Sequence, residues 1–140
     1  MLALRLVIDT NVLVSAALKP DGLERTAFLL AITKPGRLYV SAPILEEYGD
    51  VLARPELSIR RGLRLQLLQL IKNRGYLVTP SRRLEVTSDP DDNIFVECAD
   101  TARADYLVTG NHKHFPPFWK NTKIITPREF VSLAAPHLIR

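Results

Sequence analysis

The chain has 140 residues, of which 46% are hydrophobic and 24% are charged, and its formal net charge is +4. This composition excludes an intrinsically disordered chain, and no apolar run approaches the ~20 residues that a membrane-spanning helix needs. The length predicts a single domain over residues 1–140. Residues 1–9 lack the long apolar stretch of a secretory signal peptide, and the lone Cys98 excludes an intrachain disulfide. We therefore expect a cytoplasmic protein without a membrane partner.

In chain order, the sequence predicts strands that alternate with helices. Five short apolar runs predict strands over residues 4–8, 38–40, 76–78, 106–109 and 123–125. Helices are expected over residues 12–18, 23–32, 43–52 and 59–73, from 88–92 to about 103, and from 127 onward. This alternation predicts an α/β sandwich around a mostly parallel sheet.

A basic block covers residues 54–83, which hold eight Lys or Arg residues and one acid, Glu56. The block carries a net charge of +7, so the rest of the chain sums to −3. Arg60, Arg61 and Arg64 cluster on one side of the helix expected over 59–73. Such a cluster indicates either a surface that binds a polyanion or a solvated helix face.

Leu65 and Leu68 fall among these basic residues, outside the main apolar stripe of the same helix. Either a contact with a second subunit, as in a homodimer, or burial under a neighbouring helix would explain them.

Two carboxylates stand where a site of this fold class is expected. Asp9 directly follows the first strand, and ligands of parallel α/β sheets bind outside the carboxyl ends of the strands. Glu47 borders the buried face of its helix, whereas Glu46 and Asp50 point further away. Each residue also has a structural interpretation, as a helix cap for Asp9 and as a solvated helix edge for Glu47.

Three more acids open the helix that begins near residue 90: Asp89, Asp91 and Asp92. Acids at this position cap a helix and complement its dipole, but three within four residues repel one another unless a cation shares them. Helix angles alone do not choose between Asp91 and Asp92. Ligands that are all oxygen atoms suit Mg²⁺ or Mn²⁺ rather than zinc, and the basic block adds a phosphodiester as the expected substrate.

Four segments in order resemble motifs of the PIN-domain ribonucleases, and the likeness covers nearly the whole chain. They are residues 8–12, 41–52, 92–99 and 105–111. The chain is most similar to the toxin components of prokaryotic toxin–antitoxin pairs. The resemblance implies a Rossmann-like three-layer sandwich with a five-stranded sheet. It also implies Mg²⁺- or Mn²⁺-dependent hydrolysis of RNA to a 5′-phosphate and a 3′-hydroxyl, and a small antitoxin protein as partner.

The resemblance implies that Asp9, Glu47 and Asp92 are catalytic metal ligands. Thr10 and Asn11 would support Asp9 or contact a phosphate. Arg60, Arg61, Arg64 and Lys113 complete the expected substrate-binding set.

Asn111 stands where many members of the family carry an Asp, so it and Asp91 are secondary candidates for the metal site. The loss of this charge supports an alternative, a weak or inactive module that binds RNA or an antitoxin. A second alternative is an aspartyl phosphotransferase or phosphatase of the haloacid-dehalogenase type. The Asp-x-Asp pair of such enzymes is represented here by Asp9 and Asn11, which would leave the general acid missing.

The loop over residues 110–120 carries two histidines, Lys113 and three aromatic side chains. His112, Lys113 and His114 either contact phosphate or belong to a solvated loop. The aromatic residues either stack on bases or cover the edge of the sheet.

Overall fold

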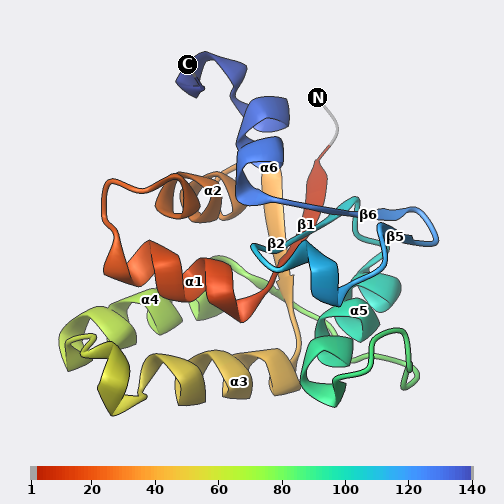
Figure 1. Cartoon of the computed structure of the whole chain (residues 1–140), viewed down its shortest axis with the longest axis horizontal. Coiled ribbons are helices and arrows are strands. Elements are labelled where there is room, and N and C mark those ends of the chain that lie inside the picture. The colour runs from red at the N-terminus through yellow and green to blue at the C-terminus, as the bar shows by residue number, and fades with distance from the viewer. Residues whose placement is uncertain (1–2, 140) are drawn as a thin grey trace.

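The computed structural model describes residues 3–139 and places a twisted sheet between helices (Figure 1). Its strands are β1 (Leu4–Ile8), β2 (Gly36–Val40), β3 (Tyr76–Leu77), β4 (Tyr106–Val108), β5 (Phe118–Trp119) and β6 (Thr122–Ile125). They lie side by side in the order β3-β2-β1-β4-β6-β5, and every neighbouring pair is parallel except β5 with β6. The expected α/β sandwich with a mostly parallel sheet is therefore confirmed.

The expectation of five strands is wrong, because the described residues form six. The additional strand, β5, lies within the segment expected to be an irregular loop. Phe118 pairs with Lys123 and Trp119 pairs with Thr122, so only two residues connect β5 to β6. Lys120 takes a positive φ of 52° in this turn, which lets the chain reverse within two residues. A two-residue strand has too short an apolar pattern to be recognised from sequence.

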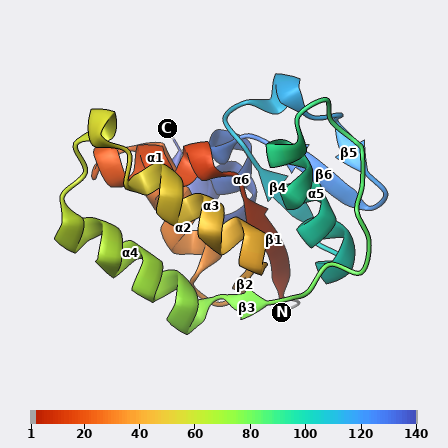
Figure 2. The ribbon, with the colours of Figure 1, turned by 90° about the horizontal axis from the view of Figure 1, so that it is seen from below.

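The helices follow the predicted order, and their ends differ from the prediction by a few residues. They are α1 (Thr10–Leu18), α2 (Leu23–Ala31), α3 (Ala42–Leu52), α4 (Arg61–Arg74), α5 (Pro90–Ala102) and α6 (Pro127–Ala134). Three short 3₁₀ helices are η1 (Pro55–Leu57), η2 (His112–His114) and η3 (Pro136–Leu138). Helix α5 packs against β1, β2 and β4 on one side of β1, whereas α1–α4 lie on the other (Figure 2). Among the described residues, no helix combines the length and the apolar character that crossing a bilayer would require.

The central strands are buried on both faces, as expected for a parallel sheet covered by helices. Leu6, Val7 and Ile8 of β1 are at most 1% exposed, and Leu107 and Val108 of β4 are fully buried. Because these strands cannot move without opening the core, the residues that directly follow them are held in fixed places. Those residues form one edge of the sheet, where the candidate site lies.

Several interpretations that the sequence left open are decided by packing. Cys98 is a free cysteine that is buried in the core, where it packs as an apolar residue of α5. Leu68 packs against the core and approaches Gly49 of α3, so a neighbouring helix explains it, whereas Leu65 is 52% exposed. Phe115 is buried and Trp119 is half-buried in the edge strand, so these two aromatic residues cover the sheet.

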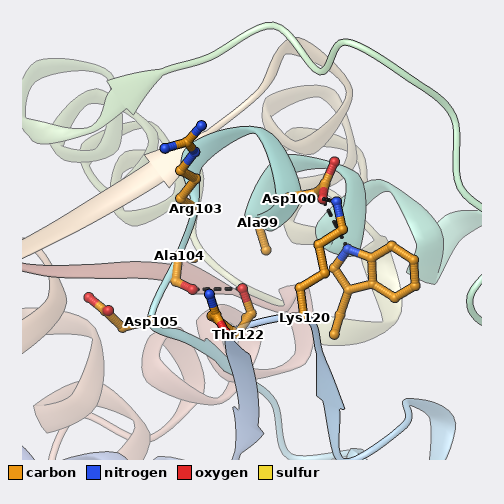
Figure 3. Close-up of a pocket in the computed structure, with 9 residues that line it drawn as sticks. Ala99, Asp100, Arg103, Ala104, Asp105, Lys120 and Thr122 are labelled. Carbon is orange, nitrogen blue, oxygen red and sulfur yellow. Dashed lines mark hydrogen bonds and ion pairs between the residues drawn. The ribbon is translucent and has the colours of Figure 1, made fainter.

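The carboxylate of Asp100, near the end of α5, anchors this edge. It accepts a hydrogen bond from the Trp119 indole at 3.1 Å and forms ion pairs with Lys120 at 3.1 Å and Arg82 at 3.2 Å. Figure 3 shows the Lys120 side chain directed at Asp100. Both residues line a cavity of about 400 Å³, together with Ala99. These donors lower the pKa of Asp100 to about 2, with the Arg82 hydrogen bond as the main cause. Asp100 therefore has a structural role, because it links Arg82 and the β5–β6 turn to α5.

We predict that Asp100→Asn lowers the free energy of unfolding at pH 7 by about 1–2 kcal/mol, because it removes three charge-assisted contacts. The folded-state pKa of about 2 lies below the ordinary 3.8, so the stabilisation is present above pH 4 and is lost as the pH falls toward 2. Urea titrations between pH 7 and pH 3 should show the difference shrinking. Asp21→Asn, at an exposed turn, is the control, and a pH-independent difference for Asp100→Asn would contradict this account.

Candidate active site

The sheet order reverses between β1 and β4, because β1 leads outward to β2 and β4 leads outward to β6. A crevice forms at the carboxyl ends of strands where the order reverses in this way, and ligands bind there. A cavity of about 580 Å³ lies at this point. The residues that line it are Asp9, Thr10, Asn11, Val14, Ser15, Glu47, Val51, Arg54, Glu56, Leu57, Asp89, Asp91, Asp92, Asn111 and His114.

Asp9 lies at the inner end of this cavity and is only 5% exposed. The Thr109 hydroxyl donates a hydrogen bond of 2.7 Å to its Oδ2 atom, and the backbone N–H of Thr10 also stabilises the carboxylate. The Thr109 hydroxyl in turn accepts a hydrogen bond from the backbone N–H of Asn111 at 3.0 Å. Burial raises the pKa of Asp9, and these donors offset only part of the increase. The carboxylate of Asp9 is thus held in place by two neutral donors, the Thr109 hydroxyl and the Thr10 backbone N–H.

Glu47 reaches the same cavity from α3, which begins at the N-cap residue Ser41. The Thr10 hydroxyl donates a hydrogen bond of 3.0 Å to Glu47 Oε2, so α1 and α3 meet across the site. The neighbouring Tyr48 is fully buried and donates from its hydroxyl to the carbonyl of Ile8, directly before Asp9. Burial is the main cause of a raised pKa for Glu47, and repulsion from the nearby acids adds to it.

The acids at the start of α5 have separate roles. Asp89 is the N-cap and accepts a hydrogen bond from the backbone N–H of Asp91 at 2.9 Å. Asp91 is exposed at the rim of the cavity, whereas Asp92 is half-buried and lies 3.8 Å from His114 Nδ1. Burial, and then repulsion from Asp9 and Asp89, raise the pKa of Asp92 to about 6. Asp92 is therefore the acid of this group that is drawn into the site.

Two asparagines, Asn11 and Asn111, also line the cavity. Asn11 Oδ1 accepts a hydrogen bond from the backbone N–H of Gly110 at 3.2 Å, which joins the start of α1 to the loop after β4. Asn111 follows in this loop and lines the cavity. Lys113 instead lines a smaller hollow of about 270 Å³ beside it.

The expected RNA-binding arginines Arg60, Arg61 and Arg64 lie at the start of α4 and do not line the cavity. Arg60 and Arg61 are exposed, and Arg64 is half-buried. The structure therefore brings together the predicted carboxylates, Thr10, Asn11 and Asn111, and places the predicted basic residues outside them.

Comparison with known proteins agrees with this arrangement. The profile of the PIN domain family matches residues 5–113, which include every predicted carboxylate of the site. The chain belongs to the PIN domain family. An uncharacterized protein of Methanocaldococcus jannaschii is 27% identical over 140 aligned positions, which cover 91% of this chain and 90% of that protein.

Among solved structures, the PIN domain described here is similar in fold to a chain of VapBC2 from Rickettsia felis, bound to a DNA fragment from their promoter. The TM-score is 0.59 with 17% sequence identity, and the match covers 88% of this chain and 98% of that one.

Sequence reasoning missed two residues of the PIN domain's site. Thr109 holds Asp9, and the parallel pairing of Ile8 with Val108 places the residues that follow them side by side. Arg54 lines the cavity with Glu47, and it follows the end of α3 by two residues. The order of the strands brings Thr109 beside Asp9, and Arg54 lies beyond the helical pattern that selected Glu47, so neither residue had a local signal.

The donor set of the cavity fits a hard divalent cation. Within residues 3–139, no three His, Cys, Asp or Glu side chains are grouped closely enough to hold one ion by themselves. Mg²⁺ usually takes one or two carboxylates and keeps several waters, so it does not require such a group. Asp9, Glu47 and Asp92 all have a raised pKa, mainly because they are buried, and a cation would relieve that unfavourable charge.

We predict that Asp92→Asn stabilises the metal-free protein by about 1 kcal/mol at pH 8. The folded-state pKa of about 6 exceeds the ordinary 3.8, so wild-type stability falls as the pH rises from 4 to 6 and stays lower above that. An asparagine carries no charge and avoids this loss. Thermal unfolding in a chelator should give a higher melting temperature for the variant at pH 8 and equal values near pH 4. The control is Asp50→Asn on the exposed side of α3, and a destabilised Asp92→Asn at pH 8 would refute the charge argument.

Proposed function

We propose that this PIN domain is a Mg²⁺- or Mn²⁺-dependent endoribonuclease that hydrolyses RNA phosphodiester bonds. The observation that carries the proposal is the convergence of Asp9, Glu47 and Asp92 on one cavity, each with its pKa raised mainly by burial. Membership of the PIN domain family supports the nuclease over the phosphotransferase alternative.

In this proposal the carboxylates of Asp9, Glu47 and Asp92 hold the cation partly through its bound waters, and the surrounding residues hold the carboxylates. Thr109 and the backbone of Thr10 keep Asp9 anionic and oriented, while the Thr10 hydroxyl fixes one oxygen of Glu47. A bound Mg²⁺ or Mn²⁺ would lower the pKa of a water and offset charge on the phosphate oxygens. Asp91 and Asn111 line the same cavity and are secondary candidates for contacts with the cation.

Basic side chains outside the cavity would hold the RNA backbone without reading its sequence. Arg60, Arg61 and Arg64 on α4 and Lys113 on η2 are the candidates, and all but Arg64 are exposed. Asn11 has its side-chain oxygen bound to Gly110, so its amide N–H₂ group is the part that faces a phosphate in this proposal.

Asn111 favours a second candidate function, a weak or inactive module that binds RNA or an antitoxin. Its amide lacks the charge that an Asp would add to the cavity. A Mn²⁺ titration distinguishes the two functions, because a binding module would bind RNA without requiring or binding the ion.

We predict that Glu47→Gln reduces Mn²⁺-dependent RNA cleavage about 100-fold or more, because it removes a charged ligand from the site. Asp9→Asn should abolish cleavage in the same assay, with the fold verified by circular dichroism. Glu46→Gln is the matched control, since Glu46 is the adjacent, exposed acid of the same helix and does not line the cavity. Equal loss in the Glu46 and Glu47 variants, or wild-type rates in Asp9→Asn, would contradict the proposed site.

We also propose that the protein acts in the cytoplasm as the toxin of a toxin–antitoxin pair, with a small antitoxin protein as partner. The fold similarity to a chain of VapBC2 supports this more specific function.

The expected outcome is that the product of a small neighbouring reading frame copurifies with this chain and suppresses its RNA cleavage. Size-exclusion chromatography of the two co-expressed proteins measures the association and shows whether the chain alone is a homodimer. A neighbouring product that neither binds nor inhibits the chain would argue against the pairing.

A further inference from the structure

Arg54 is held at the rim of the acidic cavity by the end of α3. The helix ends at Leu52, and Arg54 adopts an extended backbone, with φ −61° and ψ 126°, before η1. Its backbone N–H donates to the carbonyl of Val51 and its own carbonyl accepts from the N–H of Leu57, each at 3.1 Å. The position is thus determined on both sides, and the side chain lines the cavity with Glu47.

The guanidinium of Arg54 is available for an external ligand. Among residues 3–139, the arginine side chains that form hydrogen bonds or ion pairs within the protein are those of Arg5, Arg25 and Arg82, and Arg54 is not among them. Arg54 is exposed, and its charge lowers the pKa of Glu47 against the effect of burial. It therefore faces the acids of the site without being neutralised by a direct contact.

An RNA strand that enters this cavity meets six acids, all of which repel its phosphates: Asp9, Glu47, Glu56, Asp89, Asp91 and Asp92. Arg54 is the one arginine or lysine among the residues that line the cavity in the described part of the chain. Arg54 follows the end of α3 by two residues, lines the same cavity as Glu47 and lies near enough for its charge to lower the pKa of Glu47. A phosphate near Arg54 would therefore be a neighbour of the phosphate held at the carboxylates.

We propose that Arg54 binds an RNA phosphate adjacent to the one that is cleaved and so sets the position of the strand in the site. The proposal rests on the proposed ribonuclease function. The planar guanidinium can donate two parallel hydrogen bonds to a phosphate, a geometry that lysine cannot provide. Arg60, Arg61 and Arg64, which lie outside the cavity, would instead add general affinity for the backbone.

The test compares Arg54→Gln and Arg54→Lys with the wild type, and Arg128→Gln, at an exposed position of α6 outside the cavity, is the matched control. For a short single-stranded RNA labelled with a fluorophore, Arg54→Gln should lower kcat/KM about 10-fold or more, mainly through KM. Arg54→Lys should bind RNA more tightly than Arg54→Gln, because it keeps the positive charge. Its kcat/KM should stay well below that of the wild type, because lysine cannot fix the phosphate with two parallel hydrogen bonds. Fluorescence anisotropy in a chelator should show weaker RNA binding by Arg54→Gln and a salt slope that is smaller by about 0.7, the loss of one phosphate contact.

Metal affinity separates a phosphate-binding role from a merely structural one. Removing a positive charge from the rim makes the cavity more negative, so Arg54→Gln should bind Mn²⁺ at least as tightly as the wild type in calorimetry. Weaker Mn²⁺ binding together with a lower melting temperature would overturn the proposal, because it would indicate a distorted site.

Unchanged KM and RNA affinity in Arg54→Gln, with a wild type that cleaves RNA, would overturn the role of Arg54 alone. A wild type that neither binds nor cleaves RNA would overturn the proposed function, and the role of Arg54 with it.

Discussion

The buried carboxylate of Asp9 is the constraint on which the site depends. Strand β1 is enclosed on both faces, so the residue that follows it cannot turn outward into water. A carboxylate in that position requires donors, and Thr109 from the adjacent strand and the backbone of Thr10 provide them. The hydroxyl of Thr10 in turn donates a hydrogen bond to Glu47. Thr10 therefore holds both acids, Asp9 through its backbone and Glu47 through its side chain.

The two ends of α5 each carry an aspartate, and the surroundings shift the pKa values of these two aspartates in opposite directions. Asp100 is surrounded by donors, and its pKa falls to about 2, whereas Asp92 faces other acids and its pKa rises to about 6. The first arrangement stabilises the fold at neutral pH and the second destabilises it. A site that gathers several negative charges lowers the stability of the fold around it, because the charges repel one another. Here the paired carboxylate lies at the opposite end of the helix, where it holds the edge of the sheet.

Most of the fold followed from the sequence because apolar runs and helix-start residues are local signals. Asp9 and Glu47 became candidates through their places after a strand and beside a helix face. Asp92 was preferred over Asp91 through the resemblance to the PIN domain family, because helix angles alone did not choose between them. The pairing of Thr109 with Asp9 needed the order of the strands, which no local pattern contains. The strand β5 was missed because two residues give no periodicity, and Arg54 was missed as a cavity residue because it lies just beyond its helix.

The hydrogen bond from Tyr48 to Ile8 has a consequence for which ions the site can accept. If α3 slid along the sheet, the buried carbonyl of Ile8 would lose its partner, so the separation between Glu47 and Asp9 is set by the core. Among the described residues, no three acidic or histidine side chains are grouped around one point. Such an arrangement suits an ion that keeps part of its hydration shell and binds few protein ligands directly. Calcium seeks six to eight oxygen ligands from a flexible cage, whereas magnesium gives up its waters reluctantly. The stiffness of the α3–β1 contact would therefore favour magnesium over calcium at the proposed metal site.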